Sequence, residues 1–122
     1  MALENKITKA VLSAMKHLGN SKTLIAENSQ DALANQIWKA SAELEYALFL
    51  FSILRKNEDH SWKVDLKSKK LEIAPAIAST EELLEKAKIN FENGNFLEAY
   101  KKMWIARGYL LKVQNVLEKK RK

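Results

Sequence analysis

The sequence predicts an all-α fold, an antiparallel four-helix bundle-like domain with a short basic insert between the second and third helices. Apolar residues recur at helical spacing along most of the 122 residues. The segment 61–75, SWKVDLKSKKLEIAP, differs because its apolar residues fall on every second position. The length fits one domain, and an apolar fraction of 47% is ordinary for a globular protein. We therefore expect residues 1–122 to form a single helical domain.

Two helices are predicted in the first half, at about 3–18 and 30–56. Gly19 is a natural stop for the first helix, and the sequence leaves the path of residues 20–30 undetermined. The second helix is apolar on almost every face, a pattern typical of the most buried helix of a bundle. Its main apolar stripe comprises Leu33, Ile37, Ser41, Leu44, Leu48, Phe51 and Leu54.

Two more helices are predicted at about 80–93 and 96–119. Ser79 and Glu82 have the spacing of a capping box, which places the start of the third helix after Pro75. Asn93 and Gly94 end this helix, and Asn95 precedes the next one. The fourth helix carries a heptad seam formed by Phe96, Ala99, Met103, Ala106, Leu110, Val113 and Leu117.

The insert has two alternative interpretations. A β-hairpin would pair residues 62–66 with residues 71–73, with the apolar side chains on one face and the lysines on the other face and at the tip. No Asn-Gly or Asp-Gly pair marks a tight turn, so an extended segment laid along the bundle is the alternative. Both interpretations place a short basic segment on the surface.

Part of the second half resembles a known type of helical hairpin. Residues 83–106 read LLEKAKINFENGNFLEAYKKMWIA. They resemble a tetratricopeptide-type hairpin at Leu83, Ala87, Phe91, Gly94, Asn95, Phe96, Ala99, Met103 and Ala106. The G-N-F-x-x-A run is also similar to hairpins of microtubule-interacting-and-transport domains and of a small archaeal helical family of unassigned function, in which a Gly follows as Gly108 does here. The resemblance covers residues 83–108 only.

This resemblance implies a packing mode and a tendency toward protein–protein contact, and it implies no activity. A tetratricopeptide array needs at least three stacked repeats, and the first half of the chain does not repeat the hairpin. A partner would then contact the surface of the helical hairpin. Tyr100, Trp104 and Leu111 are the candidate residues for that surface.

Arg55 and His60, in the run RKNEDH, have the R-x4-H spacing of HEPN-type ribonucleases. In that family an Arg and a His near a helix end form the RNA-cleaving site. Lys56 replaces the polar residue that usually follows the Arg, and the order of motif and hairpin is reversed. A solvated charged turn at the end of the second helix explains the run equally well.

Composition argues against most other chemistry. The chain has no cysteine and two histidines, and no cluster has metal-ligand spacing, so we expect neither a metal site nor a cofactor. Three glycines form no phosphate-binding loop, and no small-molecule substrate is evident. There is no secretory signal and no apolar run long enough to cross a bilayer, so we expect a cytoplasmic protein that does not contact membranes.

The formal net charge of +6 lies entirely in residues 61–122 and is concentrated at two places. Such clusters can contact phosphates without sequence preference, and an aromatic ring among cations can stack on bases. Trp62 is equally suited to anchor the insert on the bundle. The candidate nucleic-acid contacts are Trp62, Lys63, Lys67, Lys69 and Lys70 in the insert and Lys119, Lys120, Arg121 and Lys122 at the C-terminal end.

The sequence thus favours a non-catalytic helical module for protein–protein interaction, an accessory subunit of a larger assembly. Non-specific nucleic-acid binding through the two basic segments is the alternative, and a HEPN-like ribonuclease is the second alternative. The partner is expected to be another protein, and the sequence leaves a homodimer open.

The basic insert generates the first testable prediction. Replacing Lys67, Lys69 and Lys70 together by Ala should leave the fold intact, since these residues lie on the polar side of the insert. If the insert contacts phosphates, binding to RNA or to a DNA duplex should weaken steeply with rising salt, and the triple variant should lose most of it. Binding that is indifferent to salt would exclude direct phosphate contact.

Overall fold

A computed structural model describes residues 2–26, 30–54 and 72–121 of the chain. These residues contain four helices and no strand: α1 (Ala2–Ala26), α2 (Gln30–Leu54), α3 (Ile73–Glu92) and α4 (Phe96–Arg121). The predicted all-α class and the number of helices are confirmed for this part of the chain. The predicted hairpin or extended insert falls largely on residues 55–71, which lie outside the described residues.

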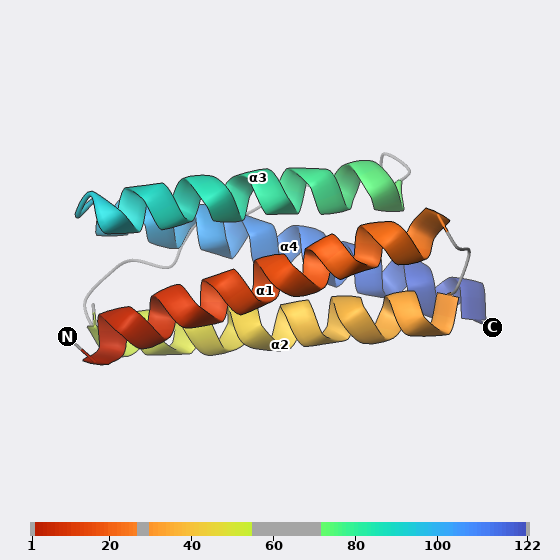
Figure 1. The fold of residues 1–122 in the computed structure, drawn as a ribbon, viewed down its shortest axis with the longest axis horizontal. Helices are drawn as coiled ribbons and strands as arrows, with labels where there is room; N and C mark the ends of the chain where they lie inside the picture. Colours follow the sequence, from red (N-terminus) through yellow and green to blue (C-terminus); the bar gives the residue numbers. More distant parts are fainter. Residues whose placement is uncertain (1, 27–29, 55–71, 122) are drawn as a thin grey trace.

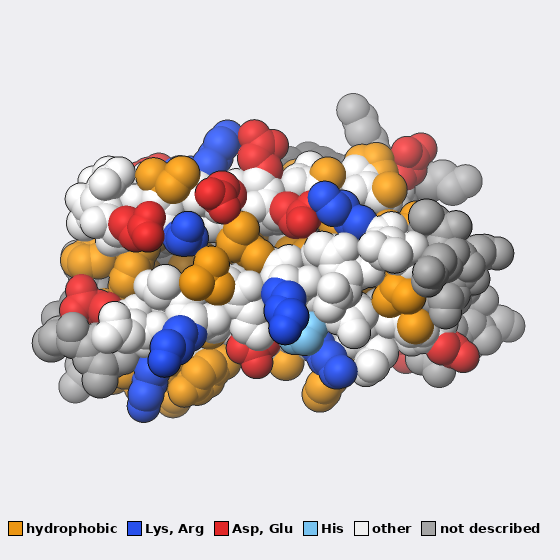
Figure 2. All heavy atoms as spheres, in the orientation of Figure 1, with side chains coloured by type: hydrophobic (Ala, Val, Ile, Leu, Met, Phe, Trp, Pro, Cys, Tyr) orange, Lys and Arg blue, Asp and Glu red, His pale blue; other side chains and the backbone are white. Residues whose placement is uncertain are grey.

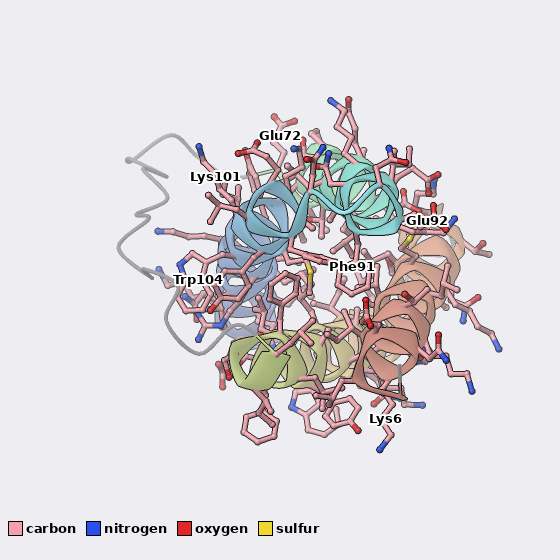
Figure 3. All side chains as sticks on the ribbon, turned by 90° about the vertical axis from the view of Figure 1, so that its left-hand side faces the viewer. Lys6, Glu72, Phe91, Glu92, Lys101 and Trp104 are labelled. Carbon is pink, nitrogen blue, oxygen red and sulfur yellow. The ribbon has the colours of Figure 1, made fainter. Side chains whose placement is uncertain are left out.

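The helices form two antiparallel hairpins, α1 with α2 and α3 with α4, packed side by side (Figure 1). Helix α2 also packs along α4, and α1 along α3. Viewed from one end, the helices occupy four corners in the order α1, α2, α4, α3 (Figure 3). Each helix therefore runs antiparallel to both of its neighbours, while the two helices on each diagonal run parallel.

The connection between the two hairpins has to join opposite ends of the bundle. Helix α2 ends at the end where α4 begins, and α3 begins at the other end, near the end of α1 (Figure 1). Four-helix bundles with parallel consecutive helices need such a crossover connection, whereas short loops suffice between antiparallel neighbours. The insert lies between α2 and α3 in the sequence. This is the connection that has to be long, because the end of α2 and the start of α3 lie at opposite ends of the bundle.

The core runs the length of the bundle and uses one apolar seam from each helix. The predicted seam of α4 is confirmed. Ala99, Met103, Ala106, Leu110, Val113 and Leu117 are all buried, and Phe96 is partly buried against the core. Helix α1 contributes Ile7, Ala10, Val11, Ala14 and Leu18. Helix α3 contributes Ala76, Ile77, Thr80, Leu84 and Ala87. Alanine recurs in these seams because a small side chain lets two helix backbones approach closely.

Gly19 does not end the first helix, contrary to the sequence prediction, because α1 continues to Ala26. The apolar spacing continues past the glycine, and Leu24 and Ile25 pack against the core. Ser21 is fully buried, and its Oγ donates a hydrogen bond to the Leu18 carbonyl at 2.6 Å. This packing outweighs the cost of about 1 kcal/mol of a glycine in a helix interior.

The predicted start of the third helix at Ser79 is also wrong. Helix α3 begins at Ile73, and the Ala76 N–H donates to the Glu72 carbonyl at 3.1 Å. Pro75 lies in the first turn, where its missing N–H would have had no partner within the helix, so the proline does not stop the helix. Ile73, placed by the sequence in the second strand of the hairpin, is therefore helical.

The turn between α3 and α4 is a Schellman motif. The Gly94 N–H donates to the Phe91 carbonyl at 3.2 Å, and the Asn95 N–H donates to the Asn90 carbonyl at 2.8 Å. Gly94 has φ +82°, a conformation that residues with a Cβ rarely adopt. The sequence prediction of a turn at Asn93 and Gly94 is confirmed.

The two glycines should respond in opposite ways to substitution by alanine. A Cβ at Gly19 would meet no atom within 4 Å. Gly19→Ala should therefore raise the free energy of unfolding by about 0.5–1 kcal/mol. Gly94→Ala should lower it by about 1–2 kcal/mol, because alanine is strained at positive φ. Urea unfolding of both variants checks this; a destabilised Gly19→Ala would contradict a continuous α1.

Candidate functional site

The outer face of α2 carries the largest exposed apolar side chains of the described part of the chain. Trp38 is 61% exposed, Tyr46 47%, Phe49 60% and Ile53 40%. Exposed Ala42 lies between them, and the spacing of 4, 4, 3 and 4 residues places all five on one side of the helix. We call these five residues, Trp38, Ala42, Tyr46, Phe49 and Ile53, the α2 stripe.

The α2 stripe lies on the side of α2 opposite the core. Ile37, Leu44 and Phe51 are completely buried on the inner side. Aromatic side chains project from the outer side of α2, away from the other three helices (Figure 3). The sequence prediction that α2 is the most buried helix, apolar because it is surrounded, is therefore wrong for this face.

Other faces of the molecule differ from the outer face of α2. Figure 2 shows the face formed by α1 and α3, where acidic and basic side chains alternate around small apolar areas. Exposed apolar residues on α1, α3 and α4, such as Leu12, Ile89 and Leu111, are not joined into a comparable row. Scattered exposed apolar residues are ordinary on a protein surface, whereas a continuous row often marks an interaction site.

Polar contacts on the flank of the α2 stripe hold α2 against α4. The Arg107 side chain of α4 forms an ion pair with Glu45, and its guanidinium lies 5.0 Å from the centroid of the Trp104 ring. One helical turn earlier, the Ser41 hydroxyl donates to Gln114 Oε1 at 3.3 Å. These contacts add to the packing of α2 on α4, beside the α2 stripe.

A groove of about 330 Å³ between α2 and α4 adjoins one end of the α2 stripe. Trp38 forms part of its wall, together with the carboxylate-bearing residues Asp31 and Glu118 and the amides of Asn35 and Gln114. The indole of Trp38 is therefore shared by the groove and the α2 stripe. The groove itself is mixed in character, because polar residues line it together with Ala34, Trp38 and Leu117.

The three residues that the sequence predicts for a partner surface differ in how exposed they are. Tyr100 is only 3% exposed and stacks on Phe51 with ring centroids 4.8 Å apart, so it belongs to the core. Trp104 is half-buried beside Tyr100, at a centroid distance of 6.4 Å. Leu111 is exposed on α4. The sequence did contain the signal for the α2 stripe, because Trp38, Tyr46, Phe49 and Ile53 lie at helical spacing, but that pattern also fits a buried helix.

Most other predicted site residues lie outside the described residues. This holds for Arg55, His60, Trp62, Lys63, Lys67, Lys69, Lys70 and Lys122. Lys119 is exposed near the end of α4, and the backbone of Lys120 and Arg121 continues the same helix. Nucleic-acid binding by the basic segments and the ribonuclease pair therefore remain predictions.

Within residues 2–26, 30–54 and 72–121, no group of three His, Asp or Glu side chains is placed to hold a metal ion. No helix in these ranges combines the length and the hydrophobicity needed to cross a membrane. Comparisons with protein-family models, with curated proteins and with solved structures found no match. The α2 stripe is thus the feature of the described residues from which a function can be argued.

Burial of Tyr100 leads to a prediction about alkaline pH. Burial raises the pKa of its phenol above the ordinary value of 10.0, because the charged phenolate is disfavoured away from water. The contribution of Tyr100 to stability should be complete below pH 10 and decline as the pH rises through the folded-state pKa. Urea unfolding at a series of pH values should show a shallower alkaline loss for Tyr100→Phe; parallel curves for the variant and the natural chain would contradict burial of the phenol.

Proposed function

We propose that this chain is a non-catalytic helical module that binds another protein through the α2 stripe. The observation that carries the proposal is the exposure of Trp38, Tyr46 and Phe49 on one side of a helix whose opposite side is fully buried. Large apolar side chains that serve only the stability of the fold are expected in the core of the bundle. An exposed aromatic row gains free energy only when something covers it.

The composition of the α2 stripe suits a protein partner. Trp and Tyr are enriched among the residues that dominate binding energy in protein interfaces, since each supplies a large area with few rotatable bonds. Burial of apolar surface contributes about 25 cal/mol per Å², so three aromatic rings can supply several kcal/mol to an association. The apolar side chains of such a row can insert into a groove of a partner or pack against a helix of a partner.

Several polar side chains in the described part of the chain make contacts within the bundle. His17 Nδ1 lies 2.9 Å from Gln36 Oε1, a contact that joins α1 to α2. Thr80 and Ser21, both fully buried, donate to backbone carbonyls of their own helices. These contacts account for these side chains as parts of the scaffold. A role as an accessory subunit also agrees with the resemblance of residues 83–108 to hairpins that mediate protein contacts.

A matched pair of variants tests the proposed function. Phe49→Lys places a charge in the middle of the α2 stripe, and Ile89→Lys places the same charge on the exposed side of α3, the helix diagonally opposite α2. Each new lysine follows a glutamate by four residues, Glu45 or Glu85, so both helices should tolerate it. Stability should change by no more than about 0.5 kcal/mol in either variant.

Affinity capture from a native lysate with the natural chain as bait should recover one protein in stoichiometric amount, either a different chain or an untagged second copy. The Ile89→Lys bait should recover the same protein, and the Phe49→Lys bait should lose it. Equal recovery by the two variants would show that the α2 stripe is not the binding surface. Recovery of nothing by the natural chain would refute the proposed function.

A further inference from the structure

Two ion pairs join the two helical hairpins of the bundle, one at each interface between them. Lys22 Nζ of α1 lies 2.9 Å from Glu81 Oε1 of α3. Arg107 of α4 forms an ion pair with Glu45 of α2. The first hairpin thus supplies a cation to one interface and a carboxylate to the other, and the second hairpin supplies the opposite charge to each.

Two hairpins of this kind can pack together in two ways. In the structure α3 packs on α1 and α4 packs on α2, which we call the crossover arrangement. Turning the second hairpin by half a turn, with its apolar seams still inward, would place α3 on α2 and α4 on α1. This is the up-and-down arrangement, which short loops suffice to connect. Burial of apolar surface by itself distinguishes poorly between the two, because the hydrophobic effect is not directional.

The same four charged residues act in the opposite sense in the up-and-down arrangement. The side of α3 that carries Glu81 would face the side of α2 that carries Glu45, so two carboxylates would meet. The side of α1 that carries Lys22 would face the side of α4 that carries Arg107, so two cations would meet. Two attractive contacts would thus be replaced by two repulsive ones.

The overall charges of the helices follow the same pattern. Helices α1 and α4 carry an excess of basic residues, and α2 and α3 carry an excess of acidic residues. In the crossover arrangement each basic helix has two acidic neighbours, because α1 and α4 lie on one diagonal of the bundle (Figure 3). The up-and-down arrangement would pack the two basic helices together and the two acidic helices together.

We infer that the ion pairs Lys22–Glu81 and Glu45–Arg107 select the crossover arrangement over the up-and-down arrangement of the same four helices. A single exposed ion pair contributes little to stability. Selection depends instead on the difference between two arrangements, in which both attractions are lost and both repulsions appear. Charges placed against an alternative topology are a common means of specifying one fold. The charges thereby account for a bundle that needs a long connection between its hairpins.

Two substitutions on the second hairpin invert the charge preference. Glu81→Lys together with Arg107→Glu, the inverted variant, makes both contacts repulsive in the crossover arrangement and attractive in the up-and-down arrangement. The net charge of the chain does not change. Glu82→Lys together with Lys86→Glu is the matched control, because this exposed ion pair lies within α3 and is present in either arrangement.

The distance between spin labels on α1 and α4 distinguishes the two arrangements. The chain has no cysteine, so Leu12→Cys and Leu111→Cys, both at exposed positions, provide two specific labelling sites. Helices α1 and α4 are diagonal in the crossover arrangement and would be neighbours, with axes about 8–10 Å apart, in the other. Double electron–electron resonance should give one long distance for the natural background and for the control, and an additional shorter distance for the inverted variant.

A fourfold variant tests whether the sign of the charges decides the outcome. Adding Lys22→Glu and Glu45→Lys to the inverted variant makes both contacts attractive again in the crossover arrangement, so the long distance alone should return. Both variants lack the Arg107 guanidinium over the Trp104 ring, so the comparison isolates charge.

Circular dichroism establishes which variants are folded. A folded inverted variant that keeps only the long distance would overturn the inference, since packing alone would then select the arrangement. If the inverted variant does not fold, a folded fourfold variant with the long distance would support the inference, and an unfolded fourfold variant would overturn it.

Discussion

Phe51, near the end of α2, is the residue on which the arrangement of the bundle depends most. Its ring stacks on Tyr100 of α4 and makes edge contacts with Phe91 of α3 and Phe96 of α4, at centroid distances of 5.7 and 6.4 Å. The two hairpins are not joined by a short loop, so side-chain packing has to fix one against the other. A fully buried phenylalanine in such a cluster contributes about 3–5 kcal/mol, as judged from the cost of truncating such residues to alanine. The Phe51 cluster therefore sets where α2 lies and which of its sides faces inward.

With its inner side packed in this cluster, α2 has a second apolar side, the α2 stripe, that is exposed in the described part of the chain. Arg107 and Gln114 of α4 contact Glu45 and Ser41 beside this second side. The two sides of α2 thus differ, since Phe51 is fully buried in the core and Phe49 is 60% exposed. Because Trp38, Tyr46 and Phe49 are largely exposed, we propose that they act in contact with another chain.

The sequence predicted the core more accurately than the surface. The seam of α4 and the turn at Gly94 followed from spacing and turn chemistry, because both are local patterns. Gly19 and Ser79 were misjudged because burial of Ser21 and Ile77 extends α1 and α3 beyond their local stop and start signals. The α2 stripe could not be recognised, since an apolar pattern on every side of a helix does not reveal which sides the other helices cover. That information lies in the tertiary arrangement, which places α3 on the diagonal from α2.

Stabilisation by the bound partner tests most directly whether the outer side of α2 serves association. A partner that binds only the folded chain stabilises it by mass action, so the thermal midpoint of the natural chain should rise when the captured partner is added. Ile89→Lys should show the same rise, and Phe49→Lys should show none. An equal rise for Phe49→Lys would contradict association through the α2 stripe.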